Sequence, residues 1–111
     1  MAEPTLQQVF GANATQTATA LTIAKADLTG LTASATNTAE SLFVAILLKA
    51  KAYLTQANYE TNIDQSITIT TPDFAAQSLV TRQDNQQYRQ FTETVNLHKL
   101  DNSNQIDPDD Y

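Results

Sequence analysis

One segment of this chain, residues 39–57 (AESLFVAILLKAKAYLTQA), is both apolar enough and long enough to organise a hydrophobic core. Its spacing predicts an α-helix that begins near Thr38, with Asn37 and Glu40 as a capping box, and ends at residue 57 or 58. Eight apolar side chains fall within one arc of about 140° on this helix, which predicts a core face. They are Leu42, Phe43, Ile46, Leu47, Ala50, Tyr53, Leu54 and Ala57.

Two further apolar residues, Val44 and Leu48, fall on another side of the same helix, separated from the core face by polar residues such as Lys51 and Ser41. A helix that lies on a single sheet needs only one apolar face. The second face therefore indicates either burial beneath the N-terminal segment of the same chain or contact with another subunit. The sequence leaves both alternatives open.

Alternating polar and apolar residues predict β-strands on both sides of the helix. Residues 66–71 (SITITT) alternate most clearly, with Ile67 and Ile69 facing inward. Residues 88–100 alternate over a longer stretch, and we expect them to form one strand that pairs antiparallel with residues 66–71. A strand is also expected over residues 17–23. These elements predict an α+β fold in which one long buried helix packs on a small, mainly antiparallel β-sheet.

The connecting segments have shorter patterns. Residues 5–10 suit a short helix or an edge strand, and residues 81–87 (TRQDNQQ) are expected to form an exposed loop. Residues 25–32 are expected to form a turn or a single helical turn, because Leu28 and Leu31 are spaced to hold this segment against the core. Residues 1–100 are thus predicted to form one α+β domain with an extended N-terminal segment.

The remaining residues, 101–111, are expected to form an acidic, extended tail. The net charge of the chain is −6, and four acidic residues lie in the last eleven positions with no basic residue among them. The rest of the chain is close to neutral. It therefore lacks the basic patch that a nucleic-acid surface needs, and no nucleic-acid partner is expected.

Residues from which active sites and metal sites are built are scarce. The chain has no Cys and no Trp, and its single histidine, His98, has no acidic residue next to it. We expect His98 to be a surface residue of a strand, not a general base. Residues 101–107 begin like a calcium-binding loop, but Ile106 stands where the sharp turn of such a loop requires glycine. We therefore expect no enzyme activity, no catalytic residue, no cofactor, no metal and no small-molecule substrate.

The composition favours contacts with other proteins. Charged residues make up 16% of the chain, compared with ~25% in ordinary soluble domains, and Thr, Gln and Asn take their place. Uncharged polar surface costs less to desolvate against a partner than Lys or Glu does. This Thr-, Ala-, Gln- and Asn-rich, Cys-free composition resembles that of small structural proteins of tailed-phage particles, such as capsid decoration (cement) proteins and tail or neck components. The resemblance extends over the whole chain and implies many copies bound to a lattice or ring.

We therefore expect a non-enzymatic structural or assembly protein that oligomerises or coats a larger assembly such as a virus capsid or tail. Its partners would be copies of itself or the proteins of that lattice. The alternative is a small soluble adaptor or inhibitor-like domain that binds one protein partner, for instance through its acidic tail. The residues expected at an interface are Val44, Leu48, Tyr59, Tyr88 and Tyr111.

The sequence also bears on location. The longest unbroken apolar run, residues 42–48, is far shorter than the ~20 residues that span a bilayer, so no membrane partner is expected. The first ten residues do not resemble a secretory signal, since no basic segment precedes an apolar one. The expected location is the virion if the protein comes from a phage, and otherwise the cytoplasm.

Overall fold

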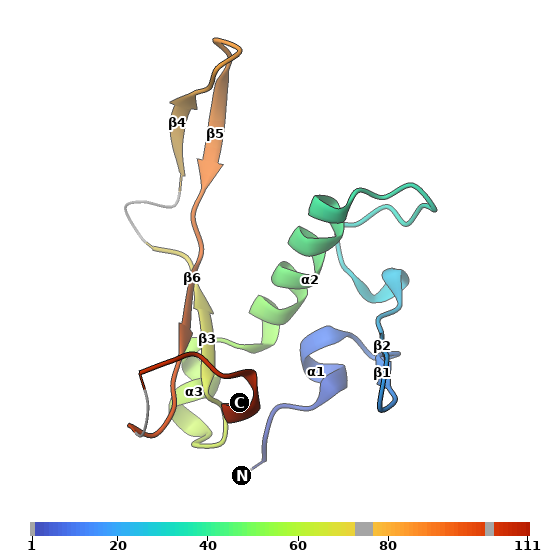
Figure 1. The fold of residues 1–111 in the computed structure, drawn as a ribbon, viewed down its shortest axis with the longest axis vertical. Coiled ribbons are helices and arrows are strands. Elements are labelled where there is room, and N and C mark those ends of the chain that lie inside the picture. The colour runs from blue at the N-terminus through green and yellow to red at the C-terminus, as the bar shows by residue number, and fades with distance from the viewer. Residues whose placement is uncertain (1, 73–76, 102–103) are drawn as a thin grey trace.

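The computed structural model describes residues 2–72, 77–101 and 104–111. Helices and short antiparallel strand pairs alternate along the chain, so the fold is α+β as the sequence predicts (Figure 1). The first half contains α1 (Leu6–Phe10), β1 (Thr15–Gln16), β2 (Leu21–Thr22), the 3-10 helix η1 (Lys25–Asp27) and α2 (Ala39–Tyr53). The second half contains α3 (Gln56–Thr61), β3 (Ile67–Thr70), β4 (Gln77–Thr81), β5 (Gln87–Phe91), β6 (Thr94–Leu97) and the 3-10 helix η2 (Pro108–Asp110).

The long helix predicted from residue 38 to residue 57 or 58 is in fact two helices. α2 ends at Tyr53, and Thr55 then begins α3 by accepting a hydrogen bond from the Asn58 N–H at 3.1 Å. The Asn58 side-chain amide donates to the Tyr53 carbonyl at 2.7 Å, which satisfies one of the free carbonyls at the end of α2. The prediction of one continuous helix is wrong because an N-cap residue inside the segment starts a new helix despite the continuous apolar pattern.

The predicted start of α2 is confirmed, but its predicted cap is not. Thr38 is the N-cap, and its hydroxyl accepts the Ser41 N–H at 3.0 Å. The Asn37 side chain is used earlier in the chain, where it accepts the Ser34 N–H at 2.9 Å. The expected capping box of Asn37 with Glu40 is therefore wrong, since a hydroxyl one residue later takes the capping position.

The N-terminal segment forms the smaller elements. Residues 5–10 adopt the helical alternative, with Thr5 and Gln8 forming a reciprocal capping box at the start of α1. The strand expected over residues 17–23 is instead the turn and second strand of a short hairpin. The Thr17 hydroxyl accepts the Thr19 and Ala20 N–H groups, and such local bonds stabilise turns over strands.

The pairing predicted for residues 66–71 is confirmed. β3 runs antiparallel to β6, with Ile67 opposite Leu97 and Ile69 opposite Val95. The single strand expected over residues 88–100 is wrong, because it divides into β6 and a second strand, β5, that pairs with β4. Strand alternation does not specify which partner a strand pairs with.

β4 and β5 form a hairpin that continues from the β3–β6 pair and projects away from the helices (Figure 1). We call this hairpin, residues 77–91, the arm. Its tip is the exposed loop that the sequence predicts. Asn85 adopts a φ of 61° there, its N–H donates to the Arg82 carbonyl at 2.9 Å, and the Arg82 N–H donates to the Gln86 carbonyl at 3.2 Å. Asparagine tolerates this left-handed conformation, which the three-residue hairpin loop requires.

The buried core lies where the end of α2 meets α3 and β3. Its buried members are Ala50, Leu54 and Ile69, and the half-buried side chains packed against them are Val9, Leu47, Tyr53 and Ile67. The Leu54 carbonyl also accepts the Ile69 N–H at 2.9 Å, which ties the edge of β3 to the end of α2. The buried Gln65 amide donates to the Thr55 and Ile67 carbonyls at 3.1 and 2.9 Å.

The predicted core face of α2 is correct for its C-terminal half only. Ala50 and Leu54 are buried, but Phe43 is 68% exposed. The β3–β6 pair has only two strands and lies near the end of α2, so the first turns of the helix extend beyond it (Figure 1). The expectation of one long buried helix is therefore only partly supported.

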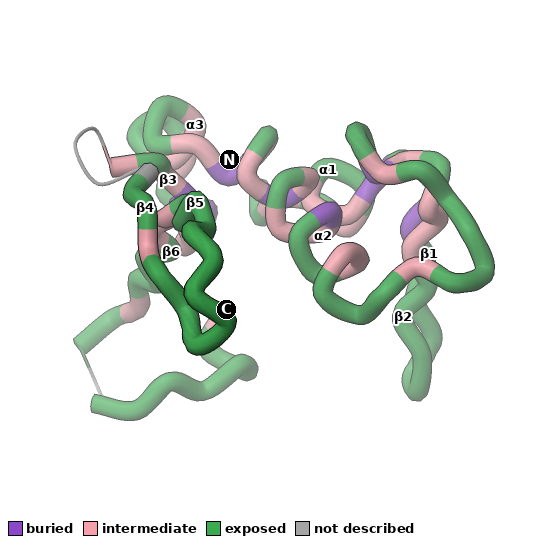
Figure 2. Tube along the Cα trace, turned by 90° about the horizontal axis from the view of Figure 1, so that it is seen from above, coloured by how far each residue is buried: buried purple, intermediate pink, exposed green. Residues whose placement is uncertain are grey.

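The resulting shape is open. The radius of gyration is 16.4 Å, whereas a compact chain of this length has about 13 Å. The accessible surface is 8399 Å², compared with about 6,000 Å² for a typical monomer of the same mass. Most of the tube in Figure 2 is exposed, with buried residues confined to a few short stretches. Much of the surface that a globular domain would bury is thus left uncovered.

A salt bridge joins α2 to the segment between the arm and β6. The Lys51 Nζ lies 2.8 Å from the Glu93 Oε1, and the Thr71 hydroxyl donates to the Glu93 Oε2 at 2.7 Å. The hydrogen bonds from Lys51 and Thr71 lower the pKa of Glu93 below its usual value of 4.5. The base of the arm is therefore held beside α2 by a charged contact.

This contact predicts a difference in acid sensitivity. Because the pKa of Glu93 is lower in the folded chain than in the unfolded chain, the group stabilises the fold above the unfolded pKa, and that stabilisation is lost as pH falls through the folded pKa. Between about pH 5 and pH 3, the free energy of unfolding of the wild type should fall more steeply than that of Glu93→Gln. Urea denaturation at several pH values measures both slopes, with Glu3→Gln as the control. Equal slopes for wild type and Glu93→Gln would contradict the prediction.

Candidate functional site

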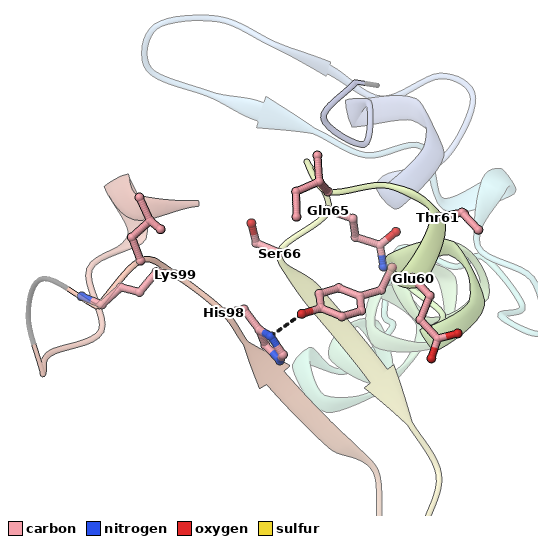
Figure 3. A pocket seen from close by; sticks show the side chains of 9 residues that line it. Glu60, Thr61, Gln65, Ser66, His98 and Lys99 are labelled. Carbon is pink, nitrogen blue, oxygen red and sulfur yellow. Dashed lines mark hydrogen bonds between the residues drawn. The ribbon is translucent and has the colours of Figure 1, made fainter.

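A pocket of about 810 Å³ lies between α3 and the end of β6 (Figure 3). Its main internal contact joins these two elements: the Tyr59 hydroxyl is hydrogen-bonded to the His98 Nδ1 at 2.7 Å. The two rings meet edge to face, with centroids 4.9 Å apart and an interplanar angle of 67°. The residues that line the pocket are Tyr59, Glu60, Thr61, Ile63, Gln65, Ser66, His98, Lys99 and Leu100.

The basic groups of this pocket hold parts of the fold together. His98 is exposed, lies directly after β6, and its Nδ1 is hydrogen-bonded to the Tyr59 hydroxyl. The Lys99 Nζ contacts the Asp110 carboxylate at 3.1 Å and the Gln105 carbonyl at 2.9 Å. Through these contacts the residues of the pocket join α3, the end of β6 and the C-terminal segment.

In the described ranges, no group of three or more His, Cys, Asp and Glu side chains lies close enough to hold a metal ion. The calcium-like stretch over residues 101–107 includes residues 102–103, which lie outside the described part of the chain. Nothing in the described tail adds a metal site to the pocket.

The acidic C-terminal segment turns back towards the body of the protein. Asp107 caps η2 by accepting the Asp109 N–H at 3.0 Å, and Asp110 pairs with Lys99. Tyr111 is half-buried and lines a pocket of about 430 Å³ together with Leu54 and residues of α1. The segment therefore contacts its own chain through both an acidic and an aromatic side chain.

A second surface, on the side of α2, is apolar. Val44 and Leu48 line a groove of about 450 Å³ and are 51% and 46% exposed. We call it the α2 groove; its other lining residues are Thr29, Gly30, Leu31, Glu40, Ser41 and Ala45. Ala45 on the same groove is buried, but the two residues that the sequence places on the second helix face are left exposed.

The arm is the third exposed surface, and it carries apolar residues on both faces. Leu79 lies opposite Arg89, Phe91 lies two residues further along β5 on the same face, and both Leu79 and Phe91 are exposed. Val80 lies opposite Tyr88 on the other face.

The arm tip is ordered by polar contacts of Tyr88. Its hydroxyl donates to the Asp84 carboxylate, and the Arg82 guanidinium lies 5.1 Å from the centre of its ring. The hydrogen bond lowers the pKa of Asp84 and raises the pKa of Tyr88. These contacts join the turn to the strands, so the arm presents a defined shape.

The five residues expected at an interface do not form one surface. Val44 and Leu48 share the α2 groove, and Tyr88 lies on the arm. Tyr59 and Tyr111 contact their own chain, through His98 and through the pocket beside α1. Whether any of the five contacts another molecule remains a prediction.

Two exposed apolar residues, Phe43 and Leu79, differ from what the sequence predicts. Phe43 falls in the predicted core arc, and helix periodicity cannot tell how much of a helix the neighbouring sheet covers. Leu79 belongs to β4, a strand that the sequence analysis did not predict. The pairing of residues 87–91 with a strand other than β3 is what makes the arm, and the sequence holds no signal for it.

No protein-family model, curated protein or solved structure matches the chain. No helix in the described part of the chain is long and apolar enough to cross a membrane.

Proposed function

We propose that this chain is a non-enzymatic structural protein that acts by assembly: it oligomerises or coats a larger protein assembly such as a virus capsid or tail. The observation that carries the proposal is the open shape. The accessible surface of 8399 Å² exceeds that of a typical monomer of this mass by about 2,400 Å². Obligate interfaces bury about 2,000–5,000 Å² in total, so the excess has the size of one such interface.

The chemistry of the uncovered surface supports the same proposal. The α2 groove and the arm expose Val44, Leu48, Leu79 and Phe91 to water. Contiguous exposed apolar surface is typical of interaction sites, because removing it from water is favourable by about 25 cal/mol per Å². The neutral polar residues around it are inexpensive to desolvate, which suits a surface that is covered for most of its lifetime.

The composition supports a particular setting for the assembly. Its resemblance to capsid decoration, tail and neck proteins of tailed phages supports a location in a virion, where the protein would be bound to copies of itself or to lattice proteins. In this setting the protein needs no catalytic residue, cofactor or nucleic-acid surface, since it contributes contacts and mass to the particle.

The proposal predicts that the wild type oligomerises and that Leu48→Glu weakens the oligomer. Light scattering over a range of concentrations measures both masses, and circular dichroism checks that the variant is folded. Leu100→Glu, at a site that is 86% exposed and outside the groove, is the control and should keep the wild-type mass. A wild type that remains monomeric at every concentration and binds one partner in a one-to-one complex would favour an adaptor instead.

A further inference from the structure

We infer that the copies associate head to tail, with the arm of one copy docked on the α2 groove of a second copy. The inference rests on the proposed function and adds which two surfaces meet. The two surfaces are different parts of the chain, so the contact does not pair a surface with itself.

The arm is the element that most needs a partner. An isolated two-stranded hairpin is marginally stable in water, because neither face of it is covered. The arm packs chiefly on itself, and it leaves the body of the protein after the Lys51–Glu93 salt bridge has fixed its base (Figure 1). Viewed from above, its residues are nearly all exposed (Figure 2). A second molecule is therefore required to cover it.

The apolar residues of the two surfaces match. The arm offers Leu79 and Phe91 on one face, and the groove offers Val44 and Leu48. Neither surface is covered by the chain's own described residues. Docking one on the other removes both sets of apolar side chains from water in one contact.

The charges of the two surfaces are also complementary. Residues 77–91 contain Arg82, Asp84 and Arg89 and so carry a net charge of +1. Glu40 is the one charged residue among those that line the α2 groove, so the basic arm would meet a carboxylate there.

The area of uncovered surface fits this arrangement. In a head-to-tail assembly each copy uses its arm towards one neighbour and its groove towards the other. Every chain thus covers both surfaces, and the about 2,400 Å² of excess surface per chain equals one complete interface of obligate size. A head-to-tail contact generates a ring if the rotation closes and a filament if it does not.

A complementation experiment tests the inference. Leu79→Glu disables the arm and leaves the groove intact, whereas Leu48→Glu disables the groove and leaves the arm intact. Each variant alone should be a folded monomer, with association weakened roughly 30-fold or more. An equimolar mixture of the two should form a one-to-one dimer, because one intact arm and one intact groove remain in each pair. Leu100→Glu should retain the wild-type mass.

Light scattering of the single variants and of the mixture distinguishes the outcomes. If the wild type oligomerises but the mixture stays monomeric, or if Leu79→Glu keeps the wild-type mass, the head-to-tail contact is overturned and the proposed assembly function stands. If the wild type is monomeric, the head-to-tail contact and the proposed oligomerisation are both overturned. Phe91→Glu and Val44→Glu form a second pair for the same mixture, in case a variant of the first pair does not fold.

Discussion

Leu54→Ala is expected to lower the free energy of unfolding by about 2–4 kcal/mol. Leu54 is 6% exposed and lies at the centre of the core, where α2 ends and its carbonyl holds the Ile69 N–H. Truncation removes apolar contacts and leaves a cavity, because the backbone bond keeps the surrounding elements from closing on it. Domains have a total stability of about 5–15 kcal/mol, so this one change removes a large share of it.

Urea denaturation followed by circular dichroism measures the effect, with Leu100→Ala as the matched control. Leu100 carries the same side chain in an exposed position, and its truncation should change the free energy of unfolding by less than about 0.5 kcal/mol. All variants are compared at one protein concentration, since assembly stabilises the folded chain by mass action. A loss below about 1 kcal/mol for Leu54→Ala would place the core elsewhere.

Gly11→Ala should lower the free energy of unfolding by about 2–4 kcal/mol. Gly11 ends α1 with φ 120° and ψ 156°, a conformation that residues with a Cβ rarely adopt. An added Cβ would lie 2.6 Å from the Asp27 Cβ, so η1 would have to move. The Asp27 carboxylate accepts both the Asn13 N–H and its side-chain amide, at 2.8 and 3.1 Å, and these bonds would be lost with that movement.

Gly30→Ala separates backbone strain from steric conflict. Gly30 also has a positive φ, 89°, but a Cβ added there meets no atom within 4 Å. The substitution should therefore cost only about 1–2 kcal/mol, the strain of the left-handed conformation. The same urea experiment compares the two variants. If Gly30→Ala were as destabilising as Gly11→Ala, the close approach of Gly11 to Asp27 would not be the cause of the larger loss.

Leu54→Ala and Gly11→Ala change two parts of the fold that lie outside the two surfaces proposed to meet. Leu54 packs in the core with Ile69 of β3, and β3 pairs with β6, the strand that follows the arm. Gly11 joins α1 to the segment that precedes α2. Neither residue lies on the arm or lines the α2 groove, so a loss of stability in these variants is distinct from the loss of association expected for Leu48→Glu and Leu79→Glu.

Local sequence patterns were sufficient to predict a helix or strand where a short segment determines its own conformation. The alternation of residues 66–71 predicted β3 and its inward-facing Ile69, and helical periodicity predicted the start of α2 and its buried Ala50. Strand and helix periods depend only on the geometry of the backbone, so such patterns can be recognised within one segment. The sequence likewise singled out Val44 and Leu48 as a second helix face, and both are exposed.

The partners of each segment required the tertiary structure. Residues 87–91 alternate as a strand does, but only the position of β4 decides that they pair with it and form the arm. Phe43 has the periodicity of a core residue, but only the small extent of the β3–β6 pair decides that the described part of the chain leaves it exposed. The burial of a side chain depends on which elements pack against it, and the periodicity of a helix or strand does not predict those neighbours. The sequence by itself thus determined the start of α2, the strand β3 and the scarcity of residues that build active sites. The tertiary structure decided which strands pair and which apolar surfaces remain exposed.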